Sequence, residues 1–219
     1  PGHLPEGRLG AADSCGLTPE FTARPKAVRW NELFAVLRAP TFEKDKDMNH
    51  KLDTDKQAFF YEQDFYVLSN FSAFTLIWNA KEKMRFDTSE AAYHWEKFPH
   101  DEDIQTAIIN APSAHEAFKI AERNKHRRRD DWDDVKVGIM RDILRAKAEQ
   151  HEYVRRKLLA TGDRELVEDS WRDDFWGWGP NHDGRNMLGK LWMEVRAELT
   201  ANAQVVRRGA AGGASERTE

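Results

Sequence analysis

The sequence has only one cysteine among its 219 residues, Cys15, and so gives no support for a disulfide framework. No cationic segment followed by an apolar one opens the chain, which argues against a secretion signal. Long apolar runs are also missing, because stretches such as 158–160 fall far short of the roughly 20 residues that a membrane helix requires. We therefore expect a soluble, cytoplasmic protein with no membrane partner.

A large excess of charge of one sign is absent as well. The 34 basic and 38 acidic side chains give a net charge of −4, so any phosphate binding must come from a local patch, and a nucleic-acid substrate is disfavoured. The 8 histidines show no metal-ligand spacing, and the sequence holds neither a Walker loop nor a GxGxxG motif. We expect no metal and no bound nucleotide cofactor, while the oligomeric state stays open.

Bulky apolar residues are plentiful, with 12 Phe and 8 Trp, which is enough for one core in a chain of this length. Residues 1–57 are predicted to form an N-terminal extension, partly disordered because its start is rich in Pro and Gly, with a short amphipathic helix around Trp30. Residues 58–200 are predicted to form the main domain. Residues 201–219, rich in Gly, Ala and Arg, are predicted to be a disordered tail.

The predicted fold class is α+β, a helix-rich single domain with a small antiparallel sheet. Aromatic and β-branched runs between polar residues predict short strands at 59–61, 65–68, 76–78, 84–86 and 166–167. Capping residues and apolar periodicity predict helices that begin near Asp87, Asp101, Ser113, Asp130 and Asn186. The helix after Ser113 is predicted to bury one face, formed by Ala114, Ala117, Phe118 and Ala121.

Two places near the start of the domain carry polar groups suited to chemistry. Small hydrogen-bonding side chains at Ser69 and Asn70, followed by Phe71, suit the wall of a pocket for a polar ring ligand, although an ordinary turn has the same composition. Glu90 and Lys97 lie seven residues apart and project from one helix face, which aligns a carboxylate with an amine. Glu90 also fits the third position of a helix capping box, which is the simpler interpretation of its spacing.

A basic run from Arg123 to Arg129 precedes Trp132. Such a run can hold a phosphate while the Trp ring stacks on a base or packs against a ribose. A solvated basic face is the usual meaning of the pattern. Because the chain as a whole is acidic, a small phosphorylated ligand is favoured over a polymer.

A Gly- and Trp-rich segment runs from Trp171 to Gly189 and includes Asp173 and Trp176. This density of glycine is incompatible with a regular helix, since each glycine costs about 1 kcal/mol there, so we expect a shaped loop. Aromatic walls beside a carboxylate suit glycoside chemistry, in which a ribosyl cation must be shielded and stabilised. Each tryptophan taken alone is also compatible with a plain core position.

Taken in order, these segments resemble the YbiA-like family, also called NADAR. The resemblance runs collinearly over residues 58–200. It is carried by Ser69-Asn70-Phe71, Ser89-Glu90, Lys97-Phe98, Trp132 with Val135-Lys136, Leu159-Ala160-Thr161-Gly162, Leu166-Val167-Glu168, Asp173 with Trp176-Gly177-Trp178-Gly179, and Gly184-Arg185-Asn186-Met187-Leu188-Gly189. The chain departs from the pattern at Trp95-Glu96 and at Glu122, which bears on the substrate rather than on the class.

The resemblance implies an N-glycosidase that cleaves phosphoribosylamino-pyrimidine intermediates of riboflavin biosynthesis into ribose 5-phosphate and an aminopyrimidine. Two alternatives stay open: a hydrolase of ADP-ribosylated guanine, and a non-catalytic module that binds ADP-ribose or NAD. Glu90 and Asp173 are the predicted catalytic residues. The predicted substrate-binding residues are Ser69, Asn70, Phe71, Lys97, Arg123, Arg129, Trp132, Trp176, Gly184 and Asn186.

Overall fold

In the computed structural model, residues 52–61, 65–79 and 83–212 are described, with side chains given up to residue 205. They belong to one unit by their contacts. The expected extension before residue 52 and the last seven residues of the expected tail therefore lie outside the described part of the chain.

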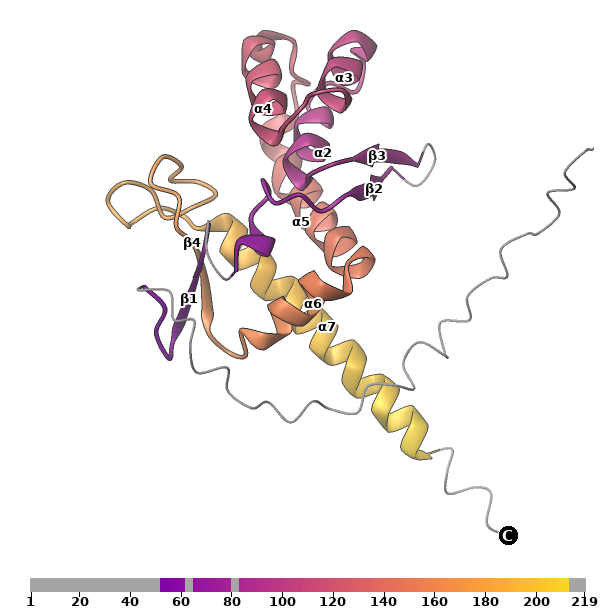
Figure 1. Ribbon diagram of the computed structural model, residues 1–219, viewed down its shortest axis with the longest axis vertical. Helices are drawn as coiled ribbons and strands as arrows, with labels where there is room; N and C mark the ends of the chain where they lie inside the picture. The colour runs from indigo at the N-terminus through magenta and orange to yellow at the C-terminus, as the bar shows by residue number, and fades with distance from the viewer. Residues whose placement is uncertain (1–51, 62–64, 80–82, 213–219) are drawn as a thin grey trace, which may run out of the picture. The chain divides into compact units, whose positions relative to one another are not determined.

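Three helices that the sequence predicts follow one another along the chain (Figure 1). They are α2 (Ser89–Trp95), α3 (Glu102–Ile109) and α4 (Ala114–Arg123). The Thr88 hydroxyl accepts a hydrogen bond from the Ala91 amide at 3.2 Å, and the Ser113 hydroxyl accepts one from the Glu116 amide at 3.2 Å. These bonds satisfy amides that have no partner inside the helix and so fix where α2 and α4 begin.

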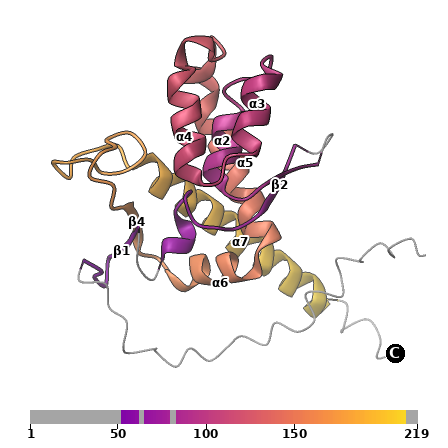
Figure 2. The same ribbon diagram turned by 45° about the horizontal axis from the view of Figure 1, so that its top comes forward.

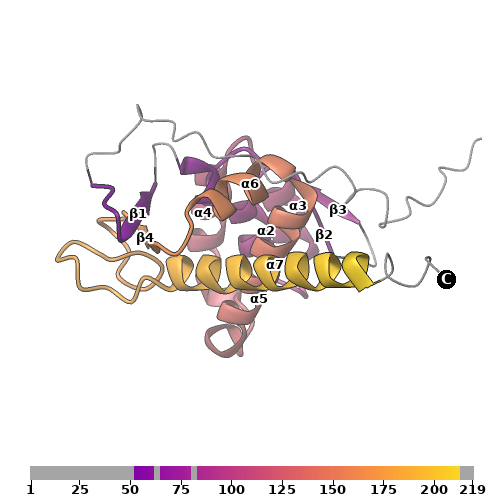
Figure 3. The same cartoon turned by 90° about the horizontal axis from the view of Figure 1, so that it is seen from below.

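Three further helices complete the scaffold: α5 (Trp132–Gln150), α6 (Glu152–Ala160) and α7 (Met187–Gly212). α6 is followed by Gly162 at φ 59°, the left-handed cap that its sequence predicts. α7 continues to residue 212 instead of ending near residue 200, where we expected the tail to begin. α7 packs against α5 and β4, and Figure 3 shows β4 near the start of α7.

In the described part of the chain, four short strands form two separate two-stranded sheets. β2 (Leu76–Trp78) pairs antiparallel with β3 (Met84–Phe86), which confirms the small antiparallel sheet. β1 (Gln57–Phe60) pairs in parallel with β4 (Glu165–Glu168), an arrangement that the sequence did not indicate. The parallel pair brings the start of the domain against the strand that leads into the Gly- and Trp-rich loop.

The predicted strand at 65–68 is wrong, because residues 66–68 form the short 3-10 helix η1 (Tyr66–Leu68). The amides of Leu68 and Ser69 donate to the carbonyls three residues earlier, each at 2.9 Å. Val67 and Leu68 are both fully buried, so the side chains do not alternate between a core face and a solvent face as they would in a half-buried strand.

The helices α2, α3, α4 and α5 gather around one core (Figure 2), with α2 in contact with each of the others. Ala117 and Ala121 are buried on the predicted face of α4, but Phe118 is 39% exposed, so its assignment to the core was wrong. Its ring instead lies at the α2–α4 boundary, 5.6 Å from the His94 ring. No helix in the described ranges is both long and apolar enough to cross a bilayer.

Candidate active site

The first turn of α2 presents a buried carboxylate. Glu90 is 9% exposed, and its Oε1 lies 2.8 Å from Nε2 of His94, one turn further along the helix. His94 is 2% exposed, and its other ring nitrogen, Nδ1, has no hydrogen-bond partner among the described residues. His94 therefore orients the Glu90 carboxylate from the same helix. An ordinary helix-capping glutamate is exposed to solvent and has no such partner.

Lys97 lies just after α2, on the same side as Glu90. Its Nζ stands 5.3 Å from the Tyr93 ring centre and 5.5 Å from that of Trp132, and it reaches Glu122 at 3.9 Å. Burial lowers the pKa of Lys97 to about 8, although the nearby charges of Glu90 and Glu122 oppose the shift. An amine with this pKa exchanges its proton near neutral pH.

Aromatic rings form the walls beside Glu90. Tyr93 on α2 meets Trp132, the first residue of α5, at 4.9 Å between ring centres, and Trp176 of the Gly- and Trp-rich loop at 5.6 Å, edge to face. Burial, followed by the negative charge of Glu90, raises the pKa of Tyr93 well above its usual range, so its hydroxyl keeps its proton. The structure thus brings together the predicted residues Trp132 and Trp176 around the ring of Tyr93, which was not among the predicted site residues.

The turn after η1 closes the site from another side. The Asn70 carbonyl accepts a hydrogen bond from the Glu90 amide at 3.1 Å, so the turn and the start of α2 are joined. Asn70 is 5% exposed, its Nδ2 donates to the Met140 sulfur at 3.4 Å, and its Oδ1 has no partner among the described residues. The next residue, Phe71, is 47% exposed. The turn therefore offers an unused acceptor and an accessible ring.

The Gly- and Trp-rich loop is held by its own polar groups. Asp173 Oδ1 accepts from the amides of Phe175 and Trp176 at 2.8 and 2.7 Å, which uses one carboxylate oxygen to shape the loop. A side chain at Gly184 would come within 2.7 Å of the Trp178 backbone, so this glycine lets two segments of the loop approach each other closely.

Asn186 has a structural position in this arrangement. Its Oδ1 accepts from the Glu168 amide at 3.0 Å, and its Nδ2 donates to the Leu166 carbonyl at 2.8 Å. Both halves of the side-chain amide are therefore used to hold the loop against β4. Asn186 and Gly184 act through the shape of the loop, as Asp173 does with its Oδ1.

Glu168, at the carboxyl end of β4, was not among the predicted site residues. It is 8% exposed, and burial raises its pKa to about 8, with the charges of Asp173 and Glu90 adding to the shift. Its carboxyl is therefore largely protonated at neutral pH. The segment Leu166-Val167-Glu168 belongs to the resemblance, but no local sequence pattern marks this carboxyl group as buried.

The basic run is tied to the site through its backbone. The Arg129 amide donates to the Lys97 carbonyl at 2.9 Å, while its guanidinium binds both oxygens of Asp131 at 2.5 and 2.8 Å. Arg127 is paired with Asp101 and Arg128 with Asp133. Within the described residues, Arg123 and Lys125 form no ion pair, and both are exposed. The charge available for a ligand is therefore smaller than the sequence suggests.

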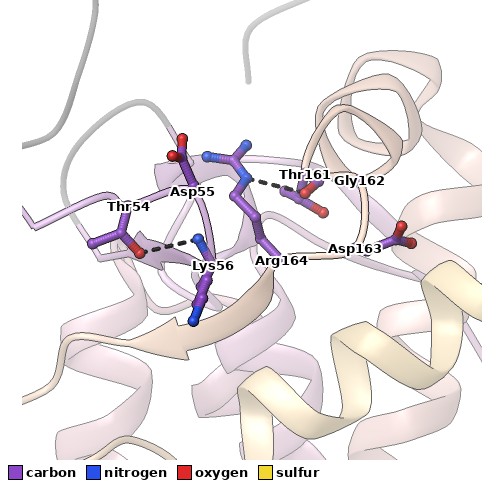
Figure 4. A pocket seen from close by; sticks show the side chains of 7 residues that line it. All are labelled: Thr54, Asp55, Lys56, Thr161, Gly162, Asp163 and Arg164. Atoms are coloured by element: carbon purple, nitrogen blue, oxygen red, sulfur yellow. Dashed lines mark hydrogen bonds between the residues drawn. The ribbon is translucent and has the colours of Figure 1, made fainter.

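Neither of two open hollows in the described part of the chain is lined by Glu90. One, of about 520 Å³, is bordered by Pro99, His100 and residues 126–131, and so adjoins the basic run. The other, of about 560 Å³, lies between residues 54–56 and 161–164 (Figure 4). It mixes acidic and basic side chains without an aromatic wall, and the Arg164 Nε is already bound to the Thr161 carbonyl at 3.0 Å.

The chemistry of the site is that of a carboxylate, an amine and a protonated carboxyl group within aromatic walls. Among the described residues, no group of three or more His, Cys, Asp or Glu side chains is arranged to hold a metal ion. Such a set suits cleavage of a bond to a carbon that becomes cationic, because the walls exclude water and the carboxylate stabilises positive charge.

Comparison with known proteins agrees with this assignment. The sequence model of the NADAR domain matches residues 59–200, and the chain belongs to the NADAR domain family. The N-glycosidase YbiA of Escherichia coli is 37% identical over 136 residues, which cover 62% of this chain and 82% of that protein. Its NMR structure superimposes with a TM-score of 0.61 at 34% identity, over 69% of this chain and 89% of the other.

A second relative is a riboflavin biosynthesis protein of Vibrio vulnificus, 41% identical over 116 residues. The match covers 53% of this chain but only 31% of the Vibrio protein. The domain is an N-glycosidase by class, because it matches most of the length of relatives that are named N-glycosidases. The α+β fold expected from the sequence is confirmed by the same structural match.

Proposed function

We propose that the protein hydrolyses the C1′–N bond of phosphoribosylamino-pyrimidine intermediates of riboflavin biosynthesis, with Glu90 and Asp173 as its catalytic carboxylates. The observation that supports it most is the buried pair of Glu90 and His94, at 2.8 Å, beneath aromatic walls and beside an amine of lowered pKa. Two relatives, from Vibrio vulnificus and Arabidopsis thaliana, carry riboflavin biosynthesis in their names.

In this proposal, Glu90 orients the attacking water and stabilises the cationic sugar. The water oxygen forms a bond to C1′ as the C1′–N bond breaks, and its proton passes to the Glu90 carboxylate, which His94 holds in place. Tyr93, Trp132 and Trp176 exclude bulk solvent, so the carboxylate interacts strongly with the positive charge that develops on the ribose.

The departing nitrogen keeps the electron pair of the broken bond and takes up a proton. Lys97, whose pKa is about 8, and Glu168, whose pKa is about 8, both carry a proton at neutral pH. Asp173 binds ribose hydroxyls through the oxygen that does not accept from the loop amides. The products are ribose 5-phosphate and an aminopyrimidine, and the balance needs only water.

Phosphate recognition is assigned to the basic run, and Arg123 is expected to contribute more to it than Arg129. Arg123→Gln should raise KM for a 5′-phosphate substrate by roughly tenfold and leave the dephosphorylated nucleoside unaffected. Arg129→Gln should have the smaller effect, because its guanidinium is already bound to Asp131. Arg85→Gln, which removes the same charge at an exposed site on β3, is the matched control. Equal changes for both substrates would exclude a phosphate role.

Trp132 should act as a wall and not as a catalyst. Trp132→Phe should weaken substrate binding several-fold in KM while kcat changes little, because a smaller ring still lines the site beside Tyr93. Trp192→Phe is unsuited as a comparison because its Nε1 donates to Leu68, whereas Trp171→Phe, at 59% exposure, is a neutral control. A kcat loss as large as that of a carboxylate variant would assign Trp132 a different role.

The substrate is tested against its main alternative by competition between two ligand classes. The protein is incubated separately with each of the two riboflavin-pathway phosphoribosylamino-pyrimidines and with an ADP-ribosylated guanosine. The kcat/KM values of the three substrates are then compared. We expect the pyrimidines to be preferred by at least tenfold. Preference for the guanosine would replace the proposed substrate while leaving the N-glycosidase class intact.

A further inference from the structure

The interior of α5 contains a lysine that the reaction does not use. Lys147 is fully buried, in a stretch of the helix where Ile143, Leu144 and Ala148 are fully buried too. Among the described residues it forms no ion pair with a carboxylate, and burial lowers its pKa to about 7. A buried amine without a counter-ion is costly, and a methionine would fill the same space without that cost.

Both hydrogen bonds of Lys147 go to one short turn. Its Nζ donates to the Ser69 carbonyl at 2.9 Å and to the Ser72 hydroxyl at 2.7 Å. The Ser72 hydroxyl in turn donates to the Ser69 carbonyl at 2.7 Å, so the amine and the hydroxyl close the turn together. The ring centres of Phe74 and Trp192 lie 5.4 and 6.0 Å from the Lys147 Nζ. A neutral amine has two N–H groups, which these two acceptors satisfy.

The turn held in this way is the one that borders the candidate active site. Between the two serines lies Asn70, whose carbonyl accepts from the Glu90 amide at 3.1 Å and whose Oδ1 has no partner in the described part of the chain. Met140, seven residues before Lys147 and therefore on the same face of α5, holds the Asn70 amide through its sulfur at 3.4 Å. α5 thus holds the turn at two points: Met140 binds Asn70, and Lys147 binds Ser69 and Ser72.

We infer that Lys147 is a positioning residue that pins the substrate-facing turn Ser69–Ser72 to α5 and so sets where Asn70 stands relative to Glu90. The inference rests on the proposed function, because it treats the turn as a wall of the substrate site. Lys147 touches no substrate itself. Its removal should loosen the turn and weaken substrate binding, while the apolar contacts that maintain the fold stay in place.

The variant Lys147→Met tests this with two independent readouts. In hydrogen exchange, the peptide covering residues 65–74 should exchange at least tenfold faster, with α5 itself unchanged and Tm equal or higher. In kinetics, KM should rise at least tenfold while kcat changes less than threefold, because Glu90 is untouched. Lys190→Met, at an exposed site on α7, is the matched control and should alter neither.

Two further variants make the result decisive. Ser72→Ala removes one acceptor with little change in volume, so it should show the same effects more weakly even if Lys147→Met does not fold. Asn70→Ala combined with Lys147→Met should be non-additive in kcat/KM, because the lysine acts through that asparagine. Unchanged exchange at 65–74, or additive effects, would overturn the inference. If the wild-type protein does not hydrolyse the substrate, the proposed function is refuted. The hydrogen-exchange data would still show whether Lys147 holds the turn.

Discussion

Glu90→Gln should lower kcat by about 10²- to 10⁴-fold, the range that a positioned general base contributes. The carboxamide keeps the volume of the side chain but cannot take a proton from water or stabilise a ribosyl cation with a full charge. Because Glu90 lies in the first turn of α2 and its amide is bound by the Asn70 carbonyl, the helix itself should form as before. KM should change little, since the loss falls on the transition state.

The control for this prediction is a glutamate at the other end of the same helix. Glu96→Gln makes the same chemical change at the end of α2, where Oε1 accepts from the Trp78 indole at 2.5 Å, an acceptor role that glutamine can keep. Its kcat should stay within a few-fold of wild type. If Glu90→Gln hydrolyses the substrate at the wild-type rate, Glu90 is a helix-capping residue and the catalytic assignment is wrong.

Glu168→Gln should make the protein more stable at pH 8 and remove part of its pH dependence. Burial raises the folded-state pKa of Glu168 from its ordinary value of 4.5 to about 8. Between these two values the unfolded chain releases a proton that the folded protein keeps, so wild-type stability falls as pH rises through this window. The accumulated difference is about 4 kcal/mol at pH 8, and glutamine, which is neutral throughout, should not show it.

The measurement is the free energy of unfolding from pH 5 to 8.5 for both proteins. The free energy of unfolding of the variant minus that of wild type should be near zero at pH 5 and grow steadily toward pH 8. Glu165→Gln, at the exposed start of the same strand, should follow the wild-type curve because that carboxyl accepts from Gln57 at the surface. Parallel curves for wild type and Glu168→Gln would show that Glu168 is charged in the folded protein.

Local sequence signals predicted the helices well. Thr88 and Ser113 cap α2 and α4 because a hydroxyl that satisfies the first amides acts over only three residues. The strand at 65–68 was mispredicted because burial of consecutive residues there is set by tertiary contacts, which propensity does not encode. The parallel pairing of β1 with β4 joins residues about a hundred positions apart, and no local pattern specifies it.

The candidate site shows the same division. Glu90, Lys97 and Trp132 could be proposed from helical spacing and from the resemblance, because both concern residue type and order. Glu168 could not, since its burial depends on the Asn186 amide and on the loop that folds back over β4. Likewise the basic run seemed free in sequence, whereas Arg127 is paired with Asp101 across the fold.

Product analysis with the phosphoribosylamino-pyrimidine substrate tests the central claim most directly. Wild-type protein, Glu90→Gln and Glu96→Gln are incubated with the substrate, and ribose 5-phosphate and free aminopyrimidine are quantified by mass spectrometry. We expect both products in equal amounts, at a rate proportional to the concentration of wild-type protein or Glu96→Gln, and almost none with Glu90→Gln. No products from the wild-type protein, or equal rates with and without the Glu90 carboxylate, would contradict the account.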